Sequence, residues 1–495
     1  MKITNKSDAS KPVEGLANTD KSHQTKHATD SLGSDRIGKL LWKFSYPAII
    51  AMLVNAIYNV VDRIYVGQGV DSLGIAAITI VMPAMMVLMA LSMLIGMGAN
   101  ALFAIKLGEG RRDLVEKIMG NALVLITVIP AVMIVICLIF IDPIVGDILG
   151  ASDAVFDYAK TYFQIILYGG IFAAVGPGLT NFIRSDGHPK TSMFSQLLGA
   201  IINIILDPIF IFGFGWGIAG AAWATIISQT LSFLFVWAYF NSRFTDLRFR
   251  LHNMRPDPKL CVSIITIGFA PFIMQIAISV IGIAQNHVLF IYGGDLAVSS
   301  IGVVYSLLVI LFMPLNGIAQ GAQPILGFNY GAQQYDRVRK TNFWAIISGT
   351  IFITCGFILI QIAPRFFISL FSSEPDLLDM GSFCLRISTA AFPFLALQIF
   401  VSQYFQSIGK WIQSTILSVS RQVVFYVPLL FLLSMQFGLD GAFWSMPIAD
   451  VLATILTSFF LFFETKRLKR LQAEVDAQSS TALNPTTSET QLLIE

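Results

Sequence analysis

Long apolar stretches follow one another along most of this chain and leave only its two ends polar. About 20 apolar residues in an α-helix cross the ~30 Å hydrocarbon core of a bilayer, and such a helix satisfies its own backbone polar groups. The sequence therefore predicts an all-α polytopic membrane protein. We place twelve transmembrane helices near residues 45–66, 75–104, 120–141, 158–183, 193–213, 218–240, 262–291, 298–327, 343–363, 381–406, 413–435 and 442–463.

The charge content argues against most other classes of protein. Only 13% of the 495 residues are charged and the net charge is +2, whereas soluble domains carry roughly a quarter charged residues. A nearly neutral chain has no bulk electrostatic attraction for nucleic acid, so we expect no nucleic-acid partner. The four cysteines stand far apart within apolar runs, a spacing that favours neither a disulfide framework nor a metal site.

Polar segments divide the chain and orient it. Lys and Arg are concentrated in the ends, in the middle and in alternate loops, while the opposite loops carry acids such as Asp142, Asp147 and Glu374. Because basic loops stay on the cytoplasmic side, we predict a multi-pass protein of the plasma (inner) membrane with both termini in the cytoplasm. The predicted units are a disordered polar N-terminal tail (1–35), an N-lobe (36–240), a cytoplasmic linker (241–261), a C-lobe (262–470) and a polar C-terminal tail (471–495).

The two halves of the chain repeat. Four residues that begin with Gly108 recur at an offset of 223, and four that begin with Gly217 recur at an offset of 221. Two homologous six-helix bundles of the same topology are therefore expected, related by a pseudo-two-fold axis. Either the duplication is kept for packing alone, or the two bundles face each other across a transport pathway, as in transporters built from parallel repeats.

Three carboxylates lie inside predicted helices: Asp62, Asp207 and Asp450. Charge is costly within a bilayer, so such residues are functional candidates by default. A buried carboxylate can take up and release a proton, and its oxygens can also hold a hard cation such as Na⁺. The alternative is a static hydrogen-bond network that joins helices, or, for Asp62, simple pairing with its neighbour Arg63.

Other polar residues of the first half share helix faces with these acids. Asn55 and Tyr58 precede Asp62 by seven and four residues, and Asn203 precedes Asp207 by four, spacings that place each set on one face. Thr225 adds a hydroxyl on the predicted helix 218–240. The first half thus concentrates carboxylate, amide, hydroxyl and phenol groups.

The second half is rich in amides instead. Gln275, Asn286, Gln320 and Gln398 lie in its predicted helices. Any one of them can simply hydrogen-bond between helices, but together they suggest the wall of an aqueous cavity that holds substrate.

A methionine stripe and helix-breaking residues add two further candidates. Met89 and Met93 belong to a stripe on the helix 75–104, which is either packing or a deformable wall suited to varied ligands. Pro47 interrupts the first predicted helix and is either a plain kink or a hinge in a conformational cycle.

The sequence offers no enzyme site. It contains no GxxxxGK[ST] loop that would bind phosphates. His287 is the one histidine inside a predicted helix, and it belongs to no HExxH or Ser/His/Asp pattern. We therefore expect no catalytic residues and no cofactor other than a coupling ion, H⁺ or Na⁺.

Three segments resemble a known family. They are Pro47…Asn55-x-x-Tyr58-x-x-x-Asp62-Arg63-Ile-Tyr-Val-Gly67, Arg184-Ser-Asp-Gly187-His-Pro189-Lys190 and Asn203-x-x-x-Asp207-Pro208…Gly217-x-x-Gly220-Ala221-Ala-Trp223-Ala-Thr225. The combination is similar to the multidrug and toxic compound extrusion (MATE) family over about residues 40–465. The acids lie in the first half, and the helices 262–291 and 298–327 lack carboxylates, which resembles the DinF/MepA-like branch.

The resemblance implies a V-shaped pair of six-helix bundles that exchanges H⁺ or Na⁺ for small amphipathic, often cationic, drug-like substrates. It also implies that Tyr58, Asp62, Asn203, Asp207 and Thr225 form a first-lobe cation and proton network, that Asn181 joins this network, and that Pro47 is the bending proline. We expect the chain to work as a monomer in the lipid bilayer.

Two other functions remain open at this point. A flippase for lipid-linked saccharides has a similar fold, but it needs a cationic central cavity for which only Arg386 and Arg421 are available. A channel or membrane receptor is the second alternative, although the acids are confined to one half and the N-terminal tail is too short to fold alone.

Overall fold

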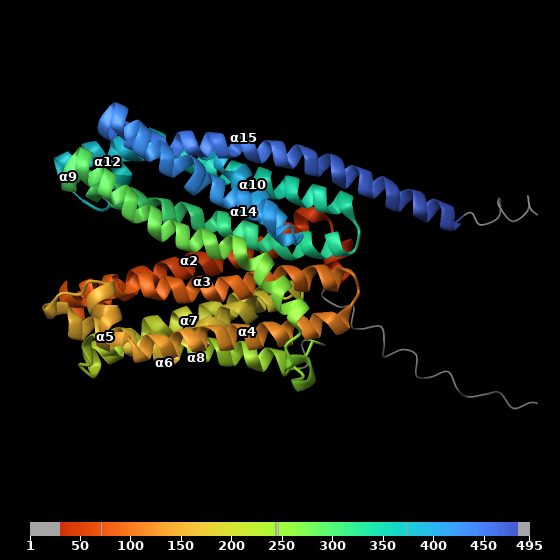
Figure 1. Ribbon diagram of the computed structural model, residues 1–495, viewed down its shortest axis with the longest axis horizontal. Coiled ribbons are helices and arrows are strands. Elements are labelled where there is room, and N and C mark those ends of the chain that lie inside the picture. The colour runs from red at the N-terminus through yellow and green to blue at the C-terminus, as the bar shows by residue number, and fades with distance from the viewer. Residues whose placement is uncertain (1–29, 71, 243–244, 246, 373, 484–495) are drawn as a thin grey trace, which may run out of the picture.

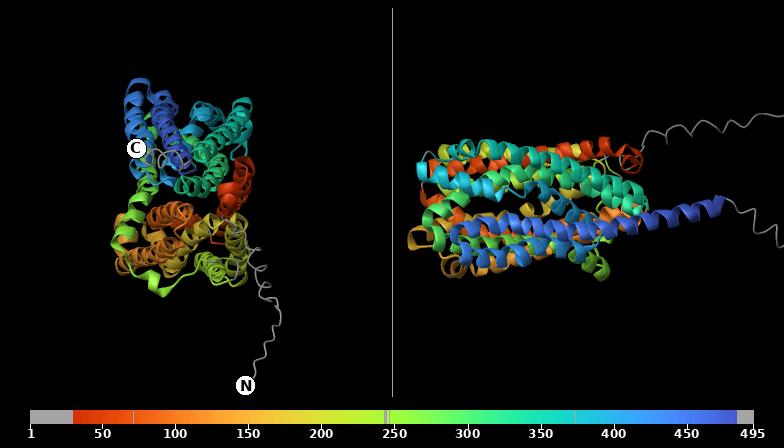
Figure 2. Two further views of the ribbon diagram at one scale, coloured as in Figure 1. Left: turned by 90° about the vertical axis from the view of Figure 1, so that its right-hand side faces the viewer. Right: turned by 90° about the horizontal axis from the view of Figure 1, so that it is seen from above.

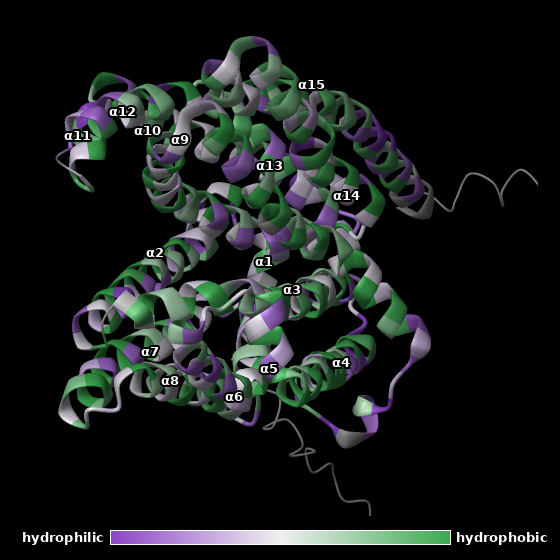
Figure 3. Cartoon of the chain, turned by 60° about the vertical axis from the view of Figure 1, so that its left-hand side comes forward, coloured by the Kyte–Doolittle hydropathy of each residue, from purple (hydrophilic) through white to green (hydrophobic). Residues whose placement is uncertain are grey.

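The computed structural model describes residues 30–70, 72–242, 245, 247–372 and 374–483, and all regular structure in this part of the chain is helical. The helices form two bundles that lie one above the other in Figure 1, the N-lobe below and the C-lobe above. Hydrophobic residues run along the helices of both lobes (Figure 3), as expected for helices surrounded by lipid.

The N-lobe contains the first half of the chain. A short helix α1 (Asp30–Ser34) precedes it, and its other elements are α2 (Ile37–Gly69), α3 (Ser72–Gly108), α4 (Arg112–Ile139), α5 (Ile141–Pro143), the π-helix η1 (Ile144–Ile148), α6 (Asp153–Ser185), α7 (Pro189–Pro208), the π-helix η2 (Ile209–Gly213) and α8 (Gly217–Phe240).

A linker with the 3₁₀-helix η3 (Leu251–Met254) leads to the C-lobe. The elements of the C-lobe are α9 (Pro258–Gly331), α10 (Tyr335–Ile362), α11 (Pro364–Ser369), α12 (Pro375–Ser388), α13 (Phe392–Ser407), α14 (Trp411–Val419), the π-helix η4 (Ser420–Tyr426) and α15 (Val427–Leu483).

The predicted twelve transmembrane helices are present. Nine helical segments among the described residues are long and apolar enough to span a membrane, and the bent pair α12–α13 supplies a tenth. The segments Pro258–Gly331 and Trp411–Gln478 each contain two spans, because Gly294 (φ 62°) and Gly438 (φ 61°) reverse the chain inside them. Only glycine adopts such positive φ values without strain. Each lobe thus has six spans.

Both predicted tails differ from the structure at their inner edges. Residues 30–34 of the N-terminal tail are helical. Leu32 is fully buried in the apolar core of the C-lobe, and Arg337 and Asn329 donate hydrogen bonds to its carbonyl. Helix α15 continues through the predicted boundary at 470 to Leu483. Its polar residues continue the helix because they are good helix formers. The rest of each tail lies outside the described residues.

The two lobes touch through backbone at Gly98 of α3 and Gly268 of α9. A Cβ atom on Gly98 would collide with the Ile264 carbonyl, and one on Gly268 would collide with the Leu94 carbonyl. Small residues let helices in membranes approach this closely. This crossing therefore depends on the absence of two side chains.

A second crossing repeats the first by symmetry. Gly321 of α9 lies against Ser45 of α2, where a Cβ atom would be 2.7 Å from the Ser45 Cα. The repeat offset of 223 relates Gly98 to Gly321 and Ser45 to Gly268. The duplication thus places a pseudo-two-fold axis between the lobes, as in an isologous contact.

These crossings lie towards one end of the molecule, which we call the linker end and which holds Gly108, the linker and Gly331. There Gly108 lies against Phe328, and Gly331 against Ile105. The ribbons of the two lobes converge towards the linker end and diverge towards the opposite end (Figure 1), and the end-on view of Figure 2 shows the lobes side by side.

The close approach at Gly268 yields a prediction. Gly268→Ala should lower stability by about 1–3 kcal/mol, because the added methyl group overpacks the crossing of the lobes. Gly282→Ala in the same helix is the control, since a Cβ there meets nothing within 4 Å and alanine favours a helix over glycine. Thermal unfolding in detergent measures both. Equal midpoints for the two variants would contradict the crossing.

Candidate functional site

Helix α2 presents Tyr58 and Asp62 on one face, one turn apart. Both side chains are half-buried. Tyr58 lies close enough to Asp62 and to Asp207 of α7 for electrostatic interaction with both. Arg63 interacts electrostatically with Asp62, but its guanidinium lies 3.8 Å from the Met82 sulfur. Simple pairing of these two neighbours therefore stays an alternative.

Helices α7 and α8 supply the other side of the site. Asp207 is fully buried in the last turn of α7, before Pro208 and the π-helix η2. The Asn203 amide donates to Asp207 Oδ1 at 3.2 Å and to Thr225 Oγ1 of α8 at 3.5 Å. One amide thus ties three of the predicted residues together. Short π-helical segments often occur at functional sites.

Three buried oxygens at this site lack a donor. They are Asp62 Oδ1, Asn203 Oδ1 and Asp207 Oδ2, none of which has a hydrogen-bond partner among the described residues. The carboxyl groups of Asp62 and Asp207 also lie close enough to interact electrostatically with each other. Two ionised carboxylates cannot hydrogen-bond, because neither has a proton to donate. The arrangement therefore suits a shared proton or a bound cation.

Tyr162 of α6 is a member of the site that sequence reasoning missed. It is buried, and it interacts electrostatically with Asp62, Tyr58 and Asp207. The only signal in the sequence was a phenol within an apolar stretch, and tyrosines are common at membrane interfaces for other reasons.

The placement of Asn181 in this network is wrong. Asn181 follows Tyr162 on α6 by 19 residues, which is about 28 Å along the axis at 1.5 Å per residue. It lies beside Gly96 of α3, towards the linker end. The local motif could not fix the depth of the residue in the membrane.

Several predicted cavity residues are accessible in the structure. Asn55, Met89 and Asn286 have exposed side chains, and those of Met93 and Gln275 are half-buried. Their contact with substrate stays a prediction. Pro47 is buried inside α2, between the two residues that contact α9, Ser45 and Ile49. Its role as a hinge also stays a prediction.

Two predicted cavity residues make structural contacts instead. Gln398 is buried and donates a hydrogen bond to the Leu417 carbonyl at 3.0 Å, so its amide joins α13 to α14. Gln320 accepts a hydrogen bond from Arg184 of α6 at 2.8 Å and therefore joins the lobes. In each case the amide has a partner within the protein.

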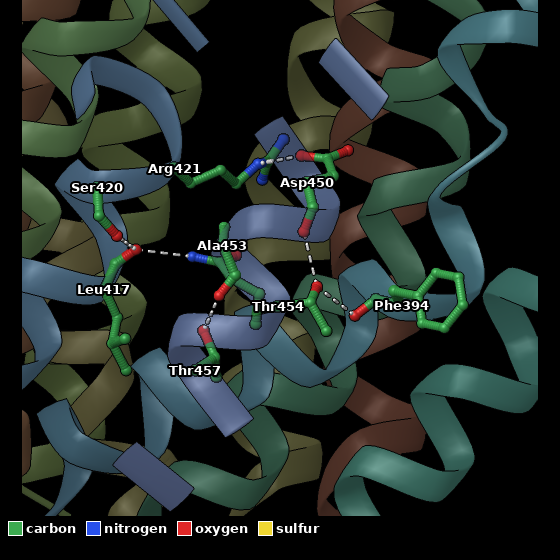
Figure 4. A network of polar contacts seen from close by, with 9 residues as sticks. Phe394, Leu417, Ser420, Arg421, Asp450, Ala453, Thr454 and Thr457 are labelled. Carbon is green, nitrogen blue, oxygen red and sulfur yellow. Dashed lines mark hydrogen bonds and ion pairs between the residues drawn. The ribbon is translucent and has the colours of Figure 1, made fainter. Parts of the chain in front are cut away.

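Asp450 of the C-lobe has a partner of its own. Arg421 Nε donates to Asp450 Oδ1 at 2.8 Å, and both side chains are largely buried (Figure 4). A guanidinium in contact neutralises this carboxylate, unlike those of Asp62 and Asp207. Asp450 thus differs from the two acids of the N-lobe.

The buried pair yields a prediction. Arg421→Leu should cost about 3–5 kcal/mol of stability, because it leaves a buried charge unpaired. The double variant Arg421→Leu/Asp450→Leu should recover most of the loss, since no charge is then stranded. Thermal unfolding of the three proteins in detergent measures this. A double variant less stable than Arg421→Leu would contradict the pairing.

No group of three or more His, Cys, Asp or Glu side chains suited to a metal ion occurs among residues with a described position. The site offers two carboxylates with amide, hydroxyl and phenol groups, a set suited to a proton or a hard monovalent cation.

Comparisons with known proteins agree with this architecture. The MatE family model matches residues 47–209 and again 271–432, so both halves carry the same unit. Multidrug export protein MepA of Staphylococcus saprophyticus is 28% identical over 442 residues, covering 88% of this chain and 96% of that protein. MepA of Staphylococcus aureus is 27% identical over 431 residues, covering 87% and 94%.

Solved structures share the fold. One, described as an outward-facing conformation of a multidrug resistance MATE family transporter, aligns with a TM-score of 0.84 over 90% of this chain and 99% of that one, at 23% identity. Another, of a MATE protein in the bent conformation, aligns with a TM-score of 0.84 over 90% and 99%, at 24% identity. The twelve helices therefore form the V-shaped fold of these proteins, and the chain belongs to the MatE family, a family of membrane transporters rather than enzymes.

Proposed function

We propose that this protein is a secondary active exporter that exchanges H⁺ or Na⁺ for small amphipathic, often cationic, drug-like compounds. Membership of the MatE family and the relatives named multidrug export protein support transport of this kind. The observation that carries ion coupling is the group of donorless oxygens shared by Asp62, Asn203 and Asp207.

This group has the chemistry that a coupling ion needs. A proton placed between the Asp62 and Asp207 carboxyls would supply the missing donor, and a Na⁺ ion would accept several oxygens at once. Both choices lower the negative charge buried in the bilayer, which is costly when uncompensated. The same oxygens serve either ion, so transport measurements must distinguish them.

Helix α2 provides a direct route from the ion site to the contact between lobes. Tyr58 and Asp62 lie in its later turns, while Ser45 and Ile49 lie against α9 in its earlier turns. Pro47 lies within the contact region, between Ser45 and Ile49, and removes one backbone hydrogen bond of α2 there. Ion binding that moves or straightens α2 would therefore change the lobe contact, provided that the ion binds the two conformations with different affinity.

We also propose a membrane location and an oligomeric state for the protein. The basic ends and linker support cytoplasmic termini in the plasma (inner) membrane. The proposal also includes a functional monomer with no nucleic-acid partner and no cofactor other than the coupling ion. Arg421 pairs with Asp450, so the cationic cavity that a saccharide-lipid flippase needs has less support than export of drugs.

Transport measurements test the proposal. Efflux of a cationic fluorescent dye should be followed in inverted vesicles, driven separately by a pH gradient and by a Na⁺ gradient. One gradient should drive efflux by the wild-type protein. Asp207→Asn and Asp62→Asn should each reduce it to the level of empty vesicles, and the double variant should lose no more, because residues that act as a unit are non-additive.

A matched control distinguishes the loss of ion coupling from the loss of a carboxylate charge in general. Asp440→Asn removes an exposed carboxylate of the C-lobe and should leave efflux unchanged. Normal gradient-driven efflux by a well-expressed Asp207→Asn protein would refute the ion site, and failure of both gradients to drive the wild type would refute antiport.

A further inference from the structure

A cavity of about 390 Å³ lies between α10 and α15 near the linker end of the C-lobe. Its walls are apolar and include Phe343, Ile346, Leu461 and Leu468, and its rim carries three basic side chains, Arg339, Lys340 and Lys469. The volume is within the range of small-molecule sites. The ion site lies in the other lobe, so this cavity is separate from it.

The repeat shows what covers the corresponding place in the N-lobe. The offset of 223 relates Asn342 and Phe343 to Met119 and Gly120 of α4. There the linker lies on the helix: a Cβ on Gly120 would collide with the Asn253 carbonyl, and the Asn253 amide donates to Glu116 Oε2 at 3.2 Å. In the C-lobe no described segment takes this position, and α15 continues straight to Leu483.

The charges at the cavity leave a net positive rim. Glu464, the one acid of the lining, is already neutralised, because Lys410 pairs with it, Arg467 lies 3.4 Å from it and Tyr404 donates to it at 3.1 Å. Lys340 and Lys469 make no ion pair among the described residues, whereas Arg339 pairs with Asp336 at 3.2 Å, one turn away on α10. The rim therefore attracts an anion that the protein itself does not supply.

A buried amide beside this cavity also lacks a partner. Asn342 is 5% exposed and lines the cavity, and its Oδ1 atom has no hydrogen-bond partner among residues that the structure describes. Buried side-chain acceptors are normally satisfied. Because Oδ1 is not exposed to the cavity in this conformation, a ligand hydroxyl would satisfy it after the carboxamide rotates towards the cavity.

The surroundings place the cavity at the surface of the bilayer. Phe343, Trp344 and Phe462 have exposed side chains beside the basic rim, and aromatic residues next to Lys and Arg are typical of the membrane interface. Helix α15 lies on the side of the C-lobe away from the N-lobe (Figure 1). A lipid can therefore reach the cavity from the side.

We propose that this cavity binds an anionic glycerophospholipid. The phosphate contacts Arg339, Lys340 and Lys469, a headgroup hydroxyl donates to Asn342 Oδ1, and an acyl chain follows the apolar wall of Phe343 and Leu461. Basic pockets between transmembrane helices bind anionic headgroups in this way. The occupant thus takes in the C-lobe the position that the linker takes in the N-lobe.

Native mass spectrometry of the full chain in detergent tests the proposal. Phosphatidylglycerol should bind more tightly than phosphatidylcholine with the same acyl chains. Arg339→Gln/Lys340→Gln/Lys469→Gln should weaken phosphatidylglycerol binding roughly 100-fold, at about fivefold for each basic residue near a membrane surface. Soluble glycerol phosphate should not compete, because it lacks the acyl chain.

Two further variants distinguish specific binding in the cavity from nonspecific attraction of an anionic lipid to basic residues. Arg111→Gln/Lys190→Gln/Arg248→Gln removes three exposed basic residues of the N-lobe and linker and should leave binding unchanged. Ile346→Trp keeps every charge and fills the cavity, so it should weaken binding as well. Thermal unfolding confirms that each variant is folded.

Three results would overturn the proposal. Equal loss of binding in the N-lobe control would mean that the lipid responds only to overall charge. Competition by glycerol phosphate at the same affinity would assign the cavity to a free phosphate. If phosphatidylglycerol binds only after residues 484–495 are deleted, the cavity belongs to that segment of the chain.

Discussion

At the linker end, the backbones of α3 and α9 touch at Gly98 and Gly268, because neither residue has a side chain to hold them apart. The repeat produces the matching contact between Ser45 and Gly321. Together with the contacts of Gly108 to Phe328 and of Gly331 to Ile105, these two crossings join the lobes around a pseudo-two-fold axis at the linker end. The remaining turns of α2 and α3 pack within the N-lobe. A contact so local allows the lobes to move as units about it, since hinge and shear motions need few residues to change conformation.

The repeat is symmetric in its backbone and asymmetric in its chemistry. Both lobes use a glycine with positive φ at equivalent places, Gly217 and Gly438. Yet the N-lobe holds two carboxylates with oxygens that lack a donor, while the buried Asp450 of the C-lobe is neutralised by Arg421. The duplication thus supplied two similar scaffolds. One of them kept unpaired acids, which are expensive in a bilayer and persist where they act; the other acquired an internal ion pair.

Sequence reasoning recovered what periodicity and spacing encode. The spans, the repeat and the faces that join Tyr58 to Asp62 and Asn203 to Asp207 follow from helical geometry alone. The predictions were wrong where the role of a residue depends on its depth in the membrane or on a partner in a distant helix. Asn181 lies about 28 Å from Tyr162 along α6, and Gln398 bonds to a carbonyl of α14, which no local pattern shows. Tyr162 was missed because a tyrosine in an apolar stretch has no distinctive signal. The length of α15 was missed because its last turns are polar but still favour a helix.

Ion binding between α2 and α7 is expected to be transmitted along α2 to the crossing of the lobes. Distance measurement between spin labels tests it most directly, with one label on each lobe at the linker end and a second pair at the opposite end. The distances should change in opposite directions when pH or Na⁺ concentration changes, and Asp62→Asn/Asp207→Asn should abolish the response. Distances that ignore both ions in the wild type, or that respond equally in the double variant, would contradict the account.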